Sequence, residues 1–179
     1  MIGQGQYESL QRTVFSRPEA SVFAVLDGCQ VEGLPQRLAS GTPESACLFE
    51  GQLDPMLQAA APYLVKLEPD SAATLMSLRE GWNAHWGIVL VADPGTGLSA
   101  VRSHLRRNLR VRGPGGEPLF FRFYDPRAFR SVVPTFEPGD RREFFGPIAG
   151  VYVEGTDPGA ALYFGRDDGA QPRSVALAA

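Results

Sequence analysis

Three carboxylates lie at predicted strand ends, where α/β enzymes commonly have their catalytic residues. Asp27, Glu50 and Asp125 each follow a short apolar run that predicts the end of a strand. His85 is the candidate base, because imidazole changes its charge near neutral pH. Together the four residues predict a small hydrolase or transferase, provided that their side chains converge in one pocket.

Each of these residues also has a structural interpretation, which we favour. Asp125 precedes Pro126, a pair typical of a helix N-terminus, and carboxylates at strand ends commonly cap helices or form turns. A histidine between Trp82 and Trp86 is more often a hydrogen-bonded core residue than a base. The chain has only two histidines, and neither has a partner at metal-ligand spacing. We therefore expect no catalytic set, no metal and no cofactor.

Dense aromatic patches at residues 81–87, 120–127 and 144–147 are the most distinctive feature of the chain. Such patches offer large amphipathic surface, suited to gripping another protein or to closing a core. Arg122 and Arg127 would then pair with carboxylates of a partner, or with Asp27 and Glu50. We predict a partner-binding surface from these residues: Trp82, His85, Trp86, Arg122, Tyr124, Asp125, Arg127 and Phe145.

The clearest predicted helix spans residues 98–110, where Leu98, Val101, Leu105 and Leu109 form one apolar stripe. Arginines flank this stripe, and a solvated helix face is the favoured interpretation. They could also form a basic rim that grips an acidic partner segment, or bind the phosphates of nucleic acid. The possible rim consists of Arg102, Arg106, Arg107 and Arg110.

The composition excludes several classes of protein. The 179 residues are 44% hydrophobic, as in soluble globular chains, and the net charge of -3 argues against general affinity for nucleic acid. No apolar run approaches the roughly 20 residues needed to span a bilayer. The N-terminal residues do not show the charged-then-apolar pattern of a secretory signal peptide. We expect a cytoplasmic protein whose two cysteines are free thiols.

Helices and strands alternate through about residue 125, which predicts an α/β fold with a mixed sheet flanked by helices. Beyond Pro134 the pattern changes to a hairpin, so we expect an α/β core over residues 1–133 and a small C-terminal β-hairpin lobe and tail over 134–179, frayed after residue 166. Gly81 is expected to end a helix in the left-handed conformation. The predicted helices span 4–15, 34–39, 55–61, 71–81, 98–110 and 126–133, and the predicted strands 22–26, 63–67, 86–91, 119–124, 150–154 and 161–164.

Several short motifs occur in an order that resembles one bacterial family. They are Val25-Leu26-Asp27-Gly28, Leu48-Phe49-Glu50-Gly51, Ala61-Pro62-Tyr63-Leu64-Val65, Gly81-Trp82 with His85-Trp86-Gly87, His104-Leu105-Arg106-Arg107, Phe121-Arg122-Phe123-Tyr124-Asp125-Pro126-Arg127 and Phe144-Phe145-Gly146-Pro147. The chain is similar, over roughly residues 20 to 150, to the type VI secretion effector adaptor or chaperone family.

The resemblance implies protein recognition and no catalysis. An adaptor of this kind binds a toxic effector in the cytoplasm and helps to load it onto the VgrG-type spike protein of the secretion tube. The expected partners are therefore an effector and a spike protein, with no nucleic acid and no membrane. The family is expected to share its α/β core and to vary in its C-terminal lobe.

Overall fold

The central strand β1 (Ser21–Asp27) shows why the apolar runs of this chain become buried strands. Its side chains alternate between two faces: Phe23 and Val25 belong to one hydrophobic cluster, whereas Val22, Ala24 and Leu26 belong to another. Both faces are covered, so the strand is apolar at every position rather than at alternate ones.

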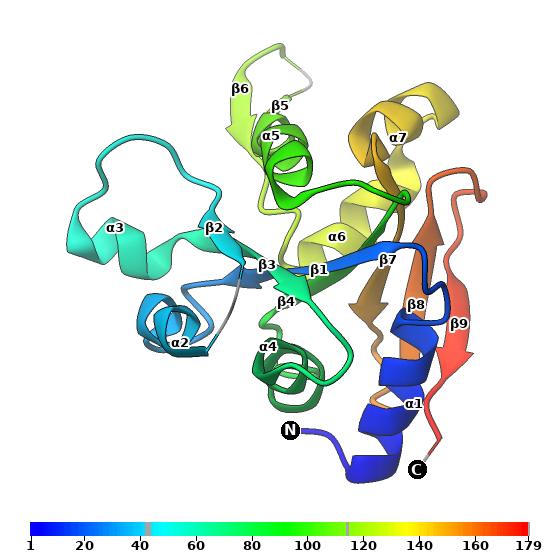
Figure 1. Cartoon of the computed structure of the whole chain (residues 1–179). Coiled ribbons are helices and arrows are strands. Elements are labelled where there is room, and N and C mark those ends of the chain that lie inside the picture. Colours follow the sequence, from blue (N-terminus) through cyan, green and yellow to red (C-terminus); the bar gives the residue numbers. More distant parts are fainter. Residues whose placement is uncertain (42–43, 114, 179) are drawn as a thin grey trace.

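The computed structural model describes residues 1–41, 44–113 and 115–178. Within them, seven strands form one sheet in the order β2-β3-β1-β4-β7-β8-β9 (Figure 1). Besides β1, these are β2 (Ser45–Cys47), β3 (Pro62–Leu67), β4 (Gly87–Ala92), β7 (Ile148–Glu154), β8 (Ala160–Gly165) and β9 (Arg173–Ala176). The α/β class is confirmed, but neighbouring strands are antiparallel throughout rather than mixed.

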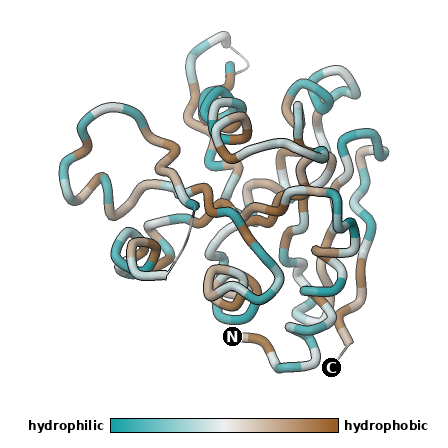
Figure 2. The backbone as a smooth tube through the Cα atoms, in the orientation of Figure 1, coloured by the Kyte–Doolittle hydropathy of each residue, from teal (hydrophilic) through white to brown (hydrophobic). Residues whose placement is uncertain are grey.

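Helices cover both faces of the sheet. On one face lie α1 (Gln4–Val14), α2 (Leu34–Gly41) and α4 (Ala72–Thr74), which continues as a π-helix over Leu75–Glu80. On the other lie α5 (Leu98–Asn108), α6 (Pro126–Val132), a 3-10 turn over Val133–Thr135, and α7 (Pro138–Phe145). The resulting three layers are visible in Figure 1, and Figure 2 shows hydrophobic residues concentrated along the central strands.

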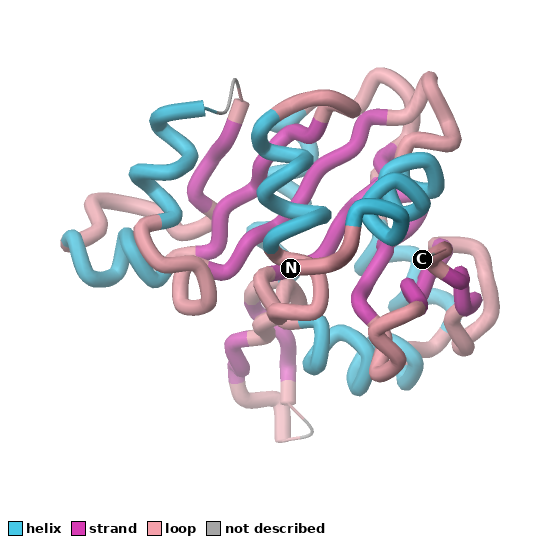
Figure 3. Tube along the Cα trace, turned by 90° about the horizontal axis from the view of Figure 1, so that it is seen from below, coloured by secondary structure: helices cyan, strands magenta, loops and turns pink. Residues whose placement is uncertain are grey.

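Two elements project from these layers. The short helix α3 (Pro55–Ala60) has no buried residue, although Asp54 caps it as the sequence predicts, by accepting from Leu57 N–H at 2.8 Å. The second is a small hairpin of β5 (Arg110–Arg112) and β6 (Pro118–Phe120), which extends away from the main sheet (Figure 3). The strand predicted over 119–124 is therefore shorter than expected, because Phe121 and Phe123 turn into the core after β6.

The C-terminal hairpin predicted from the sequence is present as β7 and β8, and it continues the main sheet by pairing with β4. The segment expected to fray after residue 166 includes β9, which pairs with β8. Phe164 of β8 packs in the same cluster as Phe23 of β1. A division of the chain near residue 133 stays a prediction, and it does not coincide with a break in the sheet.

The Phe144–Pro147 motif fastens α7 to α5. Gly146 adopts φ +50°, and a Cβ at this position would lie 2.3 Å from the His104 ring, so the close approach requires glycine. The carbonyl of Phe144 accepts hydrogen bonds from His104 at 2.7 Å and from Asn108 at 2.7 Å. The motif is therefore a packing junction, and Phe145, predicted to bind a partner, is 1% exposed in the core.

Candidate protein-binding site

A polar cluster occupies the end of the sheet where β1 finishes. Asp27 is fully buried, and its carboxylate accepts hydrogen bonds from the Arg122 guanidinium and from Cys29 N–H at 3.0 Å. The Arg122 guanidinium also lies 5.8 Å from the Tyr124 ring centre. Burial, followed by the Asp27 charge, raises the pKa of Tyr124 to about 12. The predicted pairing of Arg122 with Asp27 is therefore present within the chain.

The motif at residues 81–87 forms the turn from the π-helix into β4. Gly81 has φ -82°, so it does not end the helix in the left-handed conformation that the sequence predicts. Asn83 and His85 take up positive φ angles instead, of 62° and 59°. Gly81 is needed for space, because a Cβ there would lie 2.8 Å from the Trp86 ring.

His85 and the two tryptophans have partners within the chain. His85 Nδ1 contacts the carboxylate of Glu154, which is 2% exposed, and His85 N–H donates to the same carboxylate at 3.3 Å. Trp82 is 3% exposed and belongs to the hydrophobic cluster on the face of the sheet that α1 and α2 cover. Trp86 is half-buried beneath Arg37, whose guanidinium lies 5.1 Å from its ring centre.

Asp125 and Arg127 form a local pair at the start of α6. Asp125 accepts from Arg127 N–H at 2.9 Å, as the predicted cap, and also binds the guanidinium through both carboxylate oxygens at 2.9 and 2.7 Å. Burial alone would raise the pKa of Asp125, but the hydrogen bonds and charge of Arg127 lower it. Arg127 therefore does not pair with Asp27 or Glu50.

The predicted partner-binding residues thus lie in several places. Trp82 belongs to the core on one face of the sheet, whereas Tyr124 and Phe145 belong to the core on the other. His85, Arg122 and Arg127 retain exposed side-chain surface. The assignment of these residues to partner binding stays a prediction.

The four residues of the enzymatic alternative each have a separate partner. Asp27 pairs with Arg122, Asp125 with Arg127, and His85 with Glu154. Glu50 is 78% exposed and pairs with Arg106 at 3.2 Å. Within the described residues, no group of three or more His, Cys, Asp or Glu side chains is placed to hold a metal ion.

Two arginines of α5 hold the segment that follows β2. Arg102 Nε donates to the carbonyl of Cys47 at 3.0 Å. Arg106 donates to the carbonyls of Leu48 at 2.9 Å and Phe49 at 2.7 Å. The predicted apolar stripe of α5 is confirmed, since Val101, Leu105 and Leu109 are buried. The prediction of a solvated arginine face is only partly correct. Arg102 and Arg106 donate hydrogen bonds to backbone carbonyls that lie 55 to 58 residues away in the chain.

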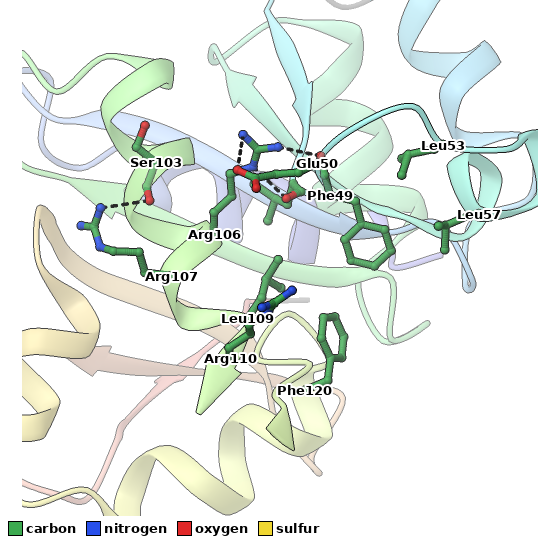
Figure 4. Close-up of a pocket in the computed structure, with 11 residues that line it drawn as sticks. Phe49, Glu50, Leu53, Leu57, Ser103, Arg106, Arg107, Leu109, Arg110 and Phe120 are labelled. Carbon is green, nitrogen blue, oxygen red and sulfur yellow. Dashed lines mark hydrogen bonds and ion pairs between the residues drawn. The ribbon is translucent and has the colours of Figure 1, made fainter. Parts of the chain in front are cut away.

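An open groove lies beside α5, and we call it the α5 groove. It is lined by residues 48–50, Leu53 and Leu57 on one side and by Ser103, Arg106, Arg107, Leu109, Arg110 and Phe120 on the other, with a volume of about 610 Å³. Figure 4 shows Phe49 and Phe120 side by side, although they come from different elements. Their ring centres are 5.8 Å apart in an edge-to-face arrangement.

The apolar side of this groove was missed by the sequence analysis. Phe120 is 53% exposed and Leu57 43% exposed, and next to them in the chain Leu119 and Met56 are also exposed. Two features of the sequence could have indicated it. Asp54-Pro55 predicts a short helix whose apolar residues do not form a stripe that would face a core. Phe120 comes just before residues that alternate into the core. Exposed apolar side chains gathered around a groove are typical of interaction sites.

His104 of α5 is buried and hydrogen-bonded, so its pKa depends on how α5 packs against α7. Its Nε2–H donates to Phe144, and Nδ1 faces Arg107 Nη2 at 3.3 Å. Burial, opposed by the Phe144 hydrogen bond, lowers the pKa of His104. The unfolded chain therefore binds a proton more readily, so the stabilisation is complete above the unfolded pKa of about 6.5 and is lost as the pH falls through the lower folded value.

We expect a His104→Gln variant, which keeps a donor for Phe144, to lose less stability than the wild type between pH 7 and pH 5. Urea unfolding at a series of pH values measures the difference. All other titratable groups are common to both proteins, so their contributions cancel in the comparison. Parallel curves for the two proteins would contradict the assignment of a lowered His104 pKa.

Comparisons with known proteins give one match. The family model described as "Domain of unknown function (DUF4123)" matches residues 22–143, which is more than half of the chain and includes every residue that lines the α5 groove. No curated protein and no solved structure matches the chain. No described helix is long and apolar enough to cross a membrane.

Proposed function

We propose, from the premise that this chain belongs to the DUF4123 family, that it is a type VI secretion effector adaptor. It binds an effector protein and helps to load it onto a VgrG-type spike protein. The family is generally associated with effector adaptors of this secretion system. The order of the motifs between Val25 and Pro147 supports the same assignment.

The observation that carries the proposal is the α5 groove. It combines aromatic side chains and arginines, which are enriched where proteins bind one another, with exposed aliphatic surface. Its lining comes from α5, from the segment around α3 and from the projecting hairpin. A partner would reach these elements without displacing any helix of the three layers.

The proposed role is non-catalytic. The carboxylates and the histidine that would serve an enzyme are each engaged in a different ion pair or hydrogen bond, as described above. The α5 groove contains Glu50 but neither His85 nor Asp27. An adaptor that meets its effector before secretion acts in the cytoplasm, and that location is part of the proposal.

An affinity pull-down from the native host tests the proposal. The tagged chain is the bait, mass spectrometry identifies what co-purifies, and an unrelated acidic protein of similar size with the same tag is the control. We expect a large toxin-like effector, a VgrG-type spike protein, or both to be enriched on the chain alone. If cells shown to express both proteins yield neither, the adaptor function is overturned.

A further inference from the structure

We propose that the α5 groove binds an acidic segment of the effector that presents a bulky apolar side chain, an inference that rests on the adaptor function proposed above. The groove would therefore select its occupant by two features together: negative charge along the segment and at least one aromatic or large aliphatic anchor. Three properties of the groove support the proposal: its exposed apolar lining, the net positive charge of that lining, and the fixed position of the segment that contains Leu48 and Phe49.

The apolar walls provide a place for the anchor. Phe49 and Phe120 form an aromatic corner, and Leu53, Leu57 and Leu109 contribute aliphatic surface on either side of it. A volume of about 610 Å³ falls within the range of about 300–1,000 Å³ that is usual for binding pockets. Burying a large apolar side chain there would favour binding, because it removes apolar surface from water.

The charge of the lining is positive in a chain whose net charge is -3. Three arginines line the groove, at positions 106, 107 and 110, against one carboxylate, Glu50, which already pairs with Arg106. Arg107 reaches back to the carbonyl of Ser103 at 3.2 Å (Figure 4). Arg110 is exposed and pairs with no carboxylate among the residues that the structure describes. A partner carboxylate would complete this arrangement, because arginine binds carboxylates through paired hydrogen bonds.

The segment of the groove that contains Leu48 and Phe49 is held in place before any partner binds. Arg106 spans from α5 to the carbonyls of Leu48 and Phe49, so it positions the Phe49 ring against Phe120. A site that is already ordered loses less conformational entropy when it binds, which favours a tight complex. Arg106 thus acts as a positioning residue, whereas Arg110 and Phe120 are the side chains that a partner would contact.

A protein segment fits this groove better than a single-stranded nucleic acid does. Nucleic-acid sites combine basic side chains with aromatic platforms, and the groove has both. However, four leucines line it, and the neighbouring exposed residues Met56 and Leu119 are aliphatic as well. Aliphatic surface offers no stacking platform for a base, but it does accommodate the apolar side chains of a peptide.

Two groove variants and two matched controls test the inference. Phe120→Ser removes the exposed ring, and Leu75→Ser is its control, since Leu75 is 39% exposed on the π-helix that packs on the opposite face of the sheet. Arg110→Glu reverses the charge, and Arg12→Glu is its control, an exposed arginine on α1. Thermal melts confirm that all four variants are folded.

The readout is the affinity of the effector recovered by the wild-type chain, after nuclease treatment. We expect each groove variant to bind it at least about tenfold more weakly, the change typical when a hot-spot side chain is lost, and each control to bind as the wild type does. A photo-crosslinker at position 120 then identifies the contacted segment. That segment is expected to be acidic, and exchanging its carboxylates for lysine should restore binding to Arg110→Glu.

The possible failures are distinct. If the wild type and both groove variants bind the effector equally, the adaptor function stands and the groove assignment is overturned. If the crosslinked segment is basic or lacks a large apolar residue, the proposed chemistry of the occupant is overturned. Loss of the wild-type complex on nuclease treatment would show a nucleic-acid site instead. If the wild type recovers no effector at all, the adaptor function fails and this inference fails with it.

Discussion

Replacing Trp82 with alanine is expected to lower the free energy of unfolding by about 3–5 kcal/mol, the usual cost of truncating a large buried aromatic side chain. Trp82 is 3% exposed and belongs to the hydrophobic cluster that includes residues of α1, α2 and the π-helix, so its truncation leaves a cavity in that cluster. Urea unfolding measures the loss. The same change is expected to weaken effector binding only in proportion to the unfolded fraction.

Trp82→Phe is the matched control. The Trp82 indole N–H is buried and has no hydrogen-bond partner among the described residues. Phenylalanine removes that unsatisfied donor and keeps most of the ring, so it should cost much less than alanine. If Trp82→Ala abolished effector binding while leaving the unfolding transition unchanged, Trp82 would be an interface residue and its placement in the core would be wrong.

Replacing Arg122 with alanine is expected to lower the free energy of unfolding by about 1–3 kcal/mol, because it leaves the buried Asp27 carboxylate without its counter-charge. Asp27 is 0% exposed and would keep only the Cys29 N–H as a hydrogen-bond donor among its described contacts. The neighbouring Tyr124 phenol cannot replace the lost positive charge, since burial and the Asp27 charge raise its pKa to about 12 and it stays neutral. Denaturant unfolding at pH 7 measures the loss.

The comparison with Arg127→Ala separates a pair whose carboxylate is fully buried from a pair in which both groups reach solvent. Arg127 is 53% exposed and its pair with Asp125 is local to α6, so its loss should cost at most about 1 kcal/mol. Adding Asp27→Asn to Arg122→Ala should recover part of the lost stability, since the uncompensated charge is then gone. Equal losses for Arg122→Ala and Arg127→Ala would show that burial of Asp27 carries no special cost.

The local features of the fold could be predicted from the sequence because their causes are local. Asp54 and Asp125 each precede a proline and cap the helices α3 and α6, as expected. The stripe from Val101 to Leu109 faces the core because its spacing matches the helical period. The directions of the strands were not predictable in this way. A continuous apolar run such as that of β1 shows that both faces of a strand are covered, not which way its neighbours run.

The candidate site could be predicted only in part, because its contacts join distant segments. Arg106 was recognised as a possible rim residue, but nothing local indicates that it binds the carbonyls of Leu48 and Phe49, 57 to 58 residues away. His85 was identified without its partner Glu154, which lies 69 residues further along. The groove itself depends on the meeting of Phe49 with Phe120, and neither residue has a distinctive spacing of its own.

The hydrogen bonds from α5 to residues 47–49 also affect how copies of the protein behave toward one another. β2 is an edge strand of the sheet, and an edge strand with unoccupied carbonyls is a template for another chain and a route to aggregation. Here Arg102 and Arg106 already bind three successive carbonyls, that of Cys47 at the end of β2 and those of Leu48 and Phe49 just after it. These three carbonyls are therefore not available to the backbone of a second copy, and a partner that reaches this end of β2 meets side chains instead.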